Sequence, residues 1–216
     1  MSRPRSYVSP RRDDAARHTR ARILDVAEQE LERSGYHATT IAGLASAAGV
    51  SPQTIYNSIG GGKAAVIKAL YDVRLAGDDE PVPMAERPEI RRIAEQSDAT
   101  AALRAYIAAG RVLYERVGRL LGILLVDGPG ADADLRAFVD TIERERRIGN
   151  ASIVTHVAGR FGLRPGVDAE QAVDIVWTLT SFEIADRLIR RCGWSLDAYE
   201  QWLGDVVVGS LTERSG

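Results

Sequence analysis

The sequence is poor in the residues that build disulfides, metal sites and nucleophilic active sites. It has a single cysteine, Cys192, which excludes an intramolecular disulfide, and only three histidines. These residues show no metal-ligand spacing, and the chain has neither a G-x-S-x-G motif nor a glycine-rich phosphate loop after a strand. We therefore predict no metal, no cofactor and no enzymatic activity. Cys192 is interpreted as inert, with a redox-sensing thiol as the alternative.

Signals for secretion or membrane insertion are also missing. The opening MSRPRSYVSPRRDD lacks the apolar core of a secretion signal. The 216 residues, 45% of them hydrophobic, suffice for one large domain or for a small module attached to a larger one. We expect a cytoplasmic protein without a membrane partner.

Charge is absent from one long segment and concentrated before it. Ser34 to Gly62 contains no Asp, Glu, Lys or Arg, although 27% of the chain is charged. Its Ser, Thr, Gly and Pro residues exclude a spanning helix, which needs roughly 20 predominantly apolar residues. Between Met1 and Leu24 the sequence has seven arginines and only two acidic residues, both aspartates. We interpret residues 1–14 as a basic tail that either contacts DNA or is simply solvated.

The uncharged segment has the pattern of a helical hairpin. An amphipathic helix over residues 23–34 is expected to end at Gly35, and a second helix, with Thr39 as its N-cap, runs from residue 41 to 48. Gly49 breaks it. Ser51 as N-cap and Pro52 at the first helical position then start a third helix.

This order of helix, tight turn and helix predicts a helix-turn-helix unit. Ala45, Val50 and Ile55 are expected to meet inside the elbow, which leaves Gln53, Thr54 and Asn57 on the outer side of the third helix. In such a unit the second helix of the pair enters the major groove, where small neutral side chains approach base edges. The basic residues that border the segment, Arg17, Arg20, Arg22 and Lys63, are expected to hold flanking phosphates.

Residues 20 to 70 resemble the N-terminal domain of the TetR (tetracycline repressor) family of bacterial transcription regulators. The matching runs are GYHATTIAGLASAAGVSPQTIYNSI and GGGKAAVIKAL. The resemblance implies that Thr39 or Thr40, Tyr56 and Lys63 contact backbone phosphates, while Ser51, Pro52, Gln53 and Thr54 face the bases. Alternatively, Tyr56 only caps the core. The sequence departs from the family pattern at Ser58, at Ile59 and in the extra glycine of GGGK.

The rest of the chain shows helical spacing and no strand pattern. The connector GDDEPVPMAERPE separates it from the first region, and long helices are expected over 103–124, 135–161, about 168–190 and 195–213. We therefore predict an all-α fold: a three-helix helix-turn-helix DNA-binding domain at 15–76, and a helical effector-binding and dimerisation domain at 77–216. The mixed charges at 143–147 are interpreted as a solvated face.

The last two predicted helices are apolar on more than one side. Apolar residues of 173–189 occupy two faces, and the final helix is similarly rich. We expect these two helices to pair with their copies across a two-fold axis, as the resemblance also implies, so that two recognition helices read the half-sites of a palindrome. The alternative is a monomer whose last helices fold back onto the body.

The resemblance further implies a small-molecule effector bound among the central helices. The candidates are polar or amphipathic residues on or beside apolar faces, each of which could instead be an ordinary core residue: Tyr106, Tyr114, Asn150, Trp177, Thr180 and Ser181. The sequence thus predicts a homodimeric bacterial regulator, usually a repressor, that an effector releases from double-stranded DNA. The alternative is a helical ligand-binding or interaction protein that has lost DNA binding, which the GGGK insertion and Ile59 leave open.

Overall fold

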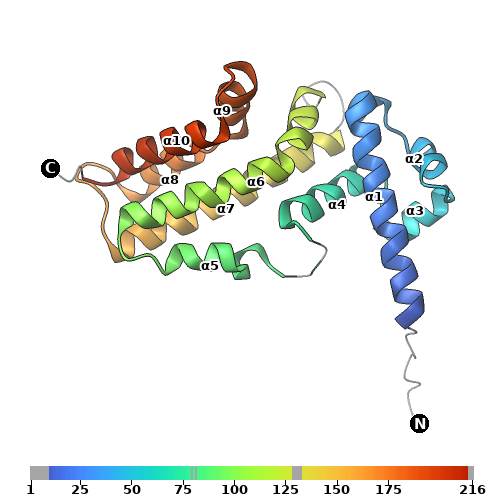
Figure 1. Cartoon of the computed structure of the whole chain (residues 1–216), viewed down its shortest axis with the longest axis horizontal. Helices are drawn as coiled ribbons and strands as arrows, with labels where there is room; N and C mark the ends of the chain where they lie inside the picture. The colour runs from blue at the N-terminus through green and yellow to red at the C-terminus, as the bar shows by residue number, and fades with distance from the viewer. Residues whose placement is uncertain (1–9, 79, 81, 128–132, 214–216) are drawn as a thin grey trace, which may run out of the picture. The chain divides into compact units, whose positions relative to one another are not determined.

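A computed structural model describes residues 10–78, 80, 82–127 and 133–213, and within these ranges it is helical with no strand (Figure 1). The predicted all-α fold is confirmed. No helix among these residues is long and apolar enough to cross a membrane. Helix α1 begins at Pro10, inside the predicted tail, whose residues 1–9 lie outside the described ranges.

Contacts divide the chain into two compact units. The first comprises Met1–Arg74 and Ile123–Phe138, and the second comprises Leu75–Gly122 and Val139–Gly216. Because helices near residues 123–138 join the first unit, each unit is built from segments that are distant in the sequence. The predicted domain limits of 15–76 and 77–216 stay predictions.

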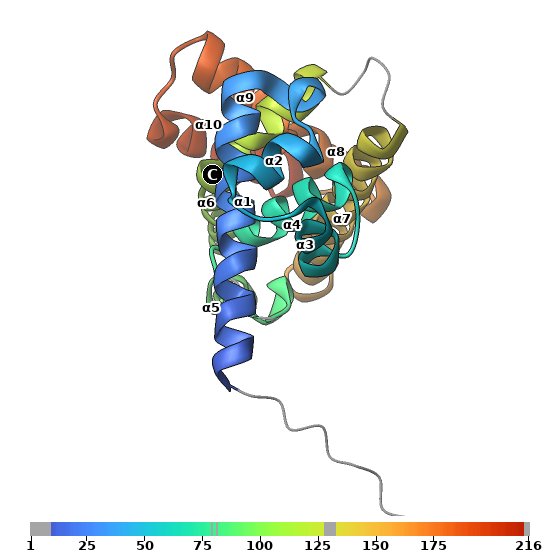
Figure 2. The same ribbon diagram turned by 90° about the vertical axis from the view of Figure 1, so that its right-hand side faces the viewer.

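The first unit contains α1 (Pro10–Ala38), α2 (Ile41–Ala47), α3 (Pro52–Ile59) and most of α4 (Lys63–Ala76). Helices α2 and α3 pack against α1 and against each other (Figure 2). The predicted apolar stripe of α1 is buried, and Gly35 interrupts this helix with a φ of 75°. All four helices contribute buried apolar side chains, among them Ile23, Leu24, Ala27, Leu31, Leu44, Ala45, Ile55, Val66, Ile67 and Leu70.

The turn between α2 and α3 follows from Gly49. Its φ of 62° is left-handed, a conformation that costs glycine little. The amide of Val50 donates to the Ala45 carbonyl at 2.9 Å, and the Gly49 amide donates to the Ser46 carbonyl at 3.2 Å. These two bonds are a Schellman motif, which closes α2 and reverses the chain. Ala45 and Ile55 are buried inside this elbow and Val50 is half-buried.

Ion pairs join helix α4 to α1. The guanidinium of Arg74 donates to Glu28 at 2.6 Å and to Asp25 at 3.0 Å. At the other segment of this unit, the ring of Tyr71 meets that of Phe138 edge-on, with 5.6 Å between centroids. Helix α4 therefore contacts α1 through Arg74 and the segment at Phe138 through Tyr71.

The second unit holds the remaining helices. Their bounds are η1 (Met84–Glu86), α5 (Pro88–Ala94), α6 (Ala99–Asp127), α7 (Ala133–Arg160), α8 (Ala169–Leu179), α9 (Phe182–Asp186), a π-helical turn η2 (Arg187–Arg191) and α10 (Leu196–Leu211). Helices α6 and α7 extend into the segment assigned to the first unit. Helix α8 packs against α10, and α6, α7, α8 and α10 contribute to a common apolar core.

One predicted helix is wrong in extent. Residues 168–190 do not form a single helix, because α8 ends at Leu179 and Ser181, with φ −65° and ψ 148°, starts a new one. The Thr180 hydroxyl donates to the Val176 carbonyl at 2.8 Å. Hydroxyl side chains offer such alternatives to the helical hydrogen bond, which the apolar periodicity does not show. The predicted final helix is confirmed, as α10.

Candidate functional site

The helix-turn-helix is held by side-chain caps at the start of α2 and of α3. The Thr40 hydroxyl accepts from the Gly43 amide at 3.1 Å, and the Ser51 hydroxyl accepts from the Thr54 amide at 3.1 Å. The prediction that Thr39 is the N-cap of α2 is wrong. Thr39 is 2% exposed, and its hydroxyl donates to the Gly35 carbonyl instead. Of these two threonines, only Thr40 is open to a ligand.

The outer face of α3 is neutral, polar and accessible. Ser51, Pro52, Gln53 and Asn57 are exposed, and Tyr56 is 45% exposed. The Gln53 amide donates to the Asn57 side-chain oxygen at 2.9 Å. Thr54, half-buried, shares a 2.8 Å hydrogen bond with the Ser51 hydroxyl. The structure thus brings all the predicted base-facing residues to the first turn of one helix, whose amides add positive partial charge.

Lys63, which the resemblance implies contacts a phosphate, is half-buried and bonded within the protein. Its ammonium group donates to the Tyr36 carbonyl at 3.0 Å and lies 3.9 Å from the centroid of the Tyr36 ring. Lys63 therefore connects the start of α4 to the end of α1. To bind a DNA phosphate, the ammonium group of Lys63 would have to leave the carbonyl and the ring of Tyr36.

The three arginines expected to hold phosphates differ in their surroundings. Arg17 is exposed and pairs with Asp14, and Arg22 is exposed without an ion pair in the described part of the chain. Arg20 is half-buried, and its guanidinium donates to the Ser58 carbonyl at the end of α3, at 3.1 Å. No sequence pattern predicts that contact, which links residues 38 positions apart.

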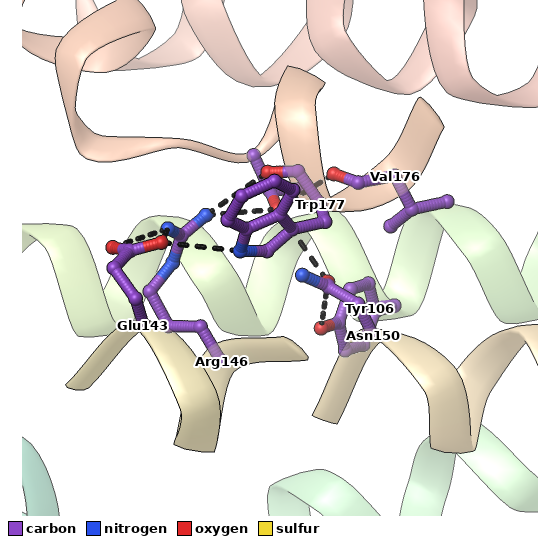
Figure 3. A network of polar contacts seen from close by, with 7 residues as sticks. Tyr106, Glu143, Arg146, Asn150, Val176 and Trp177 are labelled. Carbon is purple, nitrogen blue, oxygen red and sulfur yellow. Dashed lines mark hydrogen bonds and ion pairs between the residues drawn. The ribbon is translucent and has the colours of Figure 1, made fainter. Parts of the chain in front are cut away.

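The predicted effector residues gather in part in a polar network that joins α6, α7 and α8 (Figure 3). The Tyr106 hydroxyl donates to the Asn150 side-chain oxygen at 2.6 Å, and the Thr180 hydroxyl lies 3.4 Å from the same oxygen. Asn150 is 1% exposed. Burial raises the pKa of Tyr106 to about 12, so its hydroxyl stays a neutral donor.

An ion pair completes this network. The interpretation of residues 143–147 as a solvated face holds for Arg144, Glu145 and Arg147, which are exposed, but not for the two residues of this pair. Glu143 and Arg146 are half-buried and pair at 2.6 Å, and the Trp177 indole donates to Glu143 at 3.1 Å (Figure 3). Arg146 also donates to the Trp177 carbonyl at 3.1 Å, near the end of α8. The signal in the sequence was the spacing of Glu143, Arg146 and Asn150, which places them on one helical face.

The other two predicted effector residues lie apart from this network. Tyr114 stacks on Phe182 with 5.7 Å between ring centroids, and it also lies near Tyr199. Ser181 is the N-cap of α9 but its side chain makes no capping bond. The structure therefore groups Tyr106, Asn150, Trp177 and Thr180 and leaves Tyr114 and Ser181 outside.

Two surface grooves lie along α10. One, of about 440 Å³, is lined by Trp194, Ala198, Gln201, Trp202 and Asp205. The other, of about 340 Å³, lies between α6 and α10, where Arg111 pairs with Asp197 at 2.5 Å and with Glu200 at 2.9 Å. No group of three or more potential metal ligands occurs among the described residues.

Comparison with protein families finds one match. Residues 23–70 match the family described as bacterial regulatory proteins, tetR family. This range contains α2 and α3 with their caps, and most of α1 and α4. No curated protein sequence matches the chain significantly.

Solved structures share the fold over most of the chain. NalD of Pseudomonas aeruginosa, the secondary repressor of the MexAB-OprM multidrug efflux pump, is 20% identical, with a TM-score of 0.69 over 93% of this chain and 99% of that one. The regulator FadR of Bacillus subtilis, solved with stearoyl-CoA, is 19% identical, with a TM-score of 0.67 over 88% and 98%. FadR of Bacillus halodurans, a fatty acid degradation regulator, is 17% identical, with a TM-score of 0.66 over 91% and 97%.

Proposed function

Since the chain belongs to the tetR family of bacterial regulatory proteins, we propose that it is a homodimeric transcriptional repressor. It binds a palindromic operator through α2 and α3, and a small-molecule effector releases it. The observation that carries this proposal is the neutral, accessible face of α3, with Gln53 and Asn57 exposed and no charged residue in the helix. Amide side chains on such a face suit bidentate bonds to base edges in the major groove.

We assign the contacts on DNA to two groups. Gln53, Asn57, Ser51, Pro52 and Thr54 face the bases. Phosphates are held by Thr40, the exposed hydroxyl of Tyr56, Lys63 and the amides at the helix starts. Thr39 contributes indirectly, since its buried hydroxyl fixes the end of α1 next to Thr40.

Dimerisation is assigned to α8 and α10. These helices pack on each other, yet Ile175, Leu179, Trp202 and Val206 remain only partly buried in the single chain. The groove lined by Trp194 and Trp202 lies along α10. A second copy would cover these apolar side chains and place two recognition helices on one DNA face.

The effector is assigned to the network of Tyr106, Asn150, Trp177 and Thr180. It joins three helices of the second unit, Tyr106 packs against the apolar core of that unit, and Asn150 is buried. An amphipathic molecule would exchange hydrogen bonds with these groups while burying its apolar part. The stearoyl-CoA bound by the Bacillus subtilis neighbour fits this class of ligand. We assign no catalytic role to the chain.

The test is a mobility-shift assay on the DNA that flanks the chain's own gene, with unrelated DNA of equal length as control. We expect preferential binding whose logarithm falls with the logarithm of salt concentration by about 0.9 per phosphate contact. Gln53→Ala should weaken binding to the preferred DNA by about 1–3 kcal/mol and relax the specificity for the base pairs that Gln53 contacts. The affinity for unrelated DNA should not change. Equal binding of both DNAs by the wild-type chain would instead favour an interaction protein without operator recognition.

A further inference from the structure

Helix α3 packs against α1 and α2 but buries a single side chain completely. It has eight residues, and Ile55 is the only one of them that is fully buried. Its N-terminus is fixed by the Ser51 cap and its C-terminus by Gly60, whose amide donates to the Tyr56 carbonyl at 2.9 Å. A helix pinned at one central side chain can tilt about that point unless its ends are held. Base readout tolerates only small misplacement of the reading side chains.

Arg20 supplies an additional anchor at the end of α3 that faces away from the N-cap. It lies on α1, is half-buried, and donates from Nη1 to the Ser58 carbonyl at 3.1 Å. The last carbonyls of a helix lack helical partners and carry negative partial charge, so a guanidinium there satisfies an acceptor and neutralises the helix dipole. Helix α3 itself provides no basic residue in its last turn.

We propose that Arg20 is a positioning residue for operator recognition: it caps the C-terminus of α3 from α1 and so fixes the tilt of the helix that carries Gln53 and Asn57. This inference rests on the proposed DNA-binding function and deepens it. It gives Arg20 a role different from the phosphate contact expected from its place in the basic N-terminal region. A phosphate contact adds affinity for every sequence, whereas a positioning contact adds affinity mainly for the operator.

Arg22 offers a matched control on the same helix. It is exposed, lies two positions from Arg20 and, among the described residues, forms no hydrogen bond or ion pair with α3. Arg20→Gln and Arg22→Gln each remove one positive charge, so any difference between them reports on the contact with Ser58. Arg20→Lys keeps the charge and a donor, and serves as the conservative variant.

The experiment measures hydrogen exchange of the free protein and DNA binding of the three variants. In Arg20→Gln we expect faster exchange at the amides of residues 57–61, about tenfold, since a charge-assisted hydrogen bond is lost. We expect no change there in Arg22→Gln and partial recovery in Arg20→Lys. On DNA, Arg20→Gln should weaken operator binding about tenfold, weaken unrelated DNA no more than Arg22→Gln does, and keep the wild-type salt dependence.

The proposal is overturned if exchange at residues 57–61 is unchanged in Arg20→Gln. It is also overturned if this variant weakens operator and unrelated DNA equally and lowers the salt slope by about 0.9, the signature of a lost phosphate contact. The exchange measurement needs no DNA. A wild-type chain without operator preference would therefore reject the proposed function separately, while the exchange result still decides whether Arg20 caps α3.

Discussion

At the scale of single residues, two cations of the first unit bind backbone carbonyls. Lys63 and Arg20 each donate to a carbonyl at a helix end. The sequence identified both as candidates for phosphate contact because charge and position were all it offered. Whether a side chain points to solvent or to a carbonyl 27 or 38 residues away depends on tertiary packing, which local patterns do not encode.

Replacing Lys63 tests its structural contribution. Lys63→Met removes the bond to the Tyr36 carbonyl and the contact with its ring, so the free energy of unfolding should fall by about 1–3 kcal/mol. Lys68→Met is the control, since Lys68 makes only an exposed ion pair with Asp72 and should cost about 0.5 kcal/mol or less. Urea denaturation of both variants gives the comparison. Equal losses would show that the Tyr36 contacts contribute nothing.

Tyr106 is the second residue whose role can be measured. Tyr106→Phe leaves the buried Asn150 oxygen without its shortest hydrogen bond and should lower the free energy of unfolding by about 1–2 kcal/mol near neutral pH. The folded pKa of Tyr106 is about 12 against an ordinary 10.0, so the unfolded chain loses this proton first. The contribution of Tyr106 to the free energy of unfolding is therefore fully present below pH 10, and it is lost as the pH rises from 10 towards 12.

The Tyr106→Phe variant should lose less stability than the wild type across this alkaline window. Tyr199, whose pKa burial also raises to about 12, keeps titrating in both proteins. Denaturant unfolding at pH 9 and pH 11 measures the difference. An identical pH dependence in the two proteins would mean that Tyr106 ionises as easily in the folded chain as in the unfolded one.

At the scale of elements, the sequence predicted the helix-turn-helix with its turn and most caps, because these depend on local chemistry. Ser51, Pro52 and Gly49 act through their own backbone and nearest neighbours, and the structure confirms each. Gly35, predicted to end the first helix, interrupts α1, which then continues to Ala38. The break at Thr180 and Ser181 was missed, since continuous apolar spacing predicted a longer helix. Arg146 donates to the Trp177 carbonyl there, a stabilising contact from another helix.

The glycines after α3 give a test at this scale. Gly60 has a φ of 88°, whereas Gly62 has no left-handed φ and open space around its Cα. Gly60→Ala should lower the free energy of unfolding by about 1–2 kcal/mol. Gly62→Ala, as the matched control, should be neutral or slightly stabilising. Thermal unfolding of the two variants compares them. If both change stability equally, the left-handed cap is not what ends α3.

At the scale of the whole molecule, sequence patterns established the all-α class, and the family match and the solved neighbours agree with it. The polar network that joins α6, α7 and α8 was harder to predict. Tyr106, Asn150 and Thr180 could be named one by one as polar residues on apolar faces, but their meeting depends on how three helices pack. The partners Glu143 and Arg146 were overlooked because a charge run usually faces solvent.

We propose that two copies of the chain place two α3 helices on one face of DNA. Hydroxyl-radical footprinting on the preferred DNA fragment tests this arrangement. We predict two protected patches of inverted sequence, about one helical turn or 10 base pairs apart from centre to centre, both weakened by Gln53→Ala. A single protected patch, or uniform protection that Gln53→Ala leaves unchanged, would contradict it.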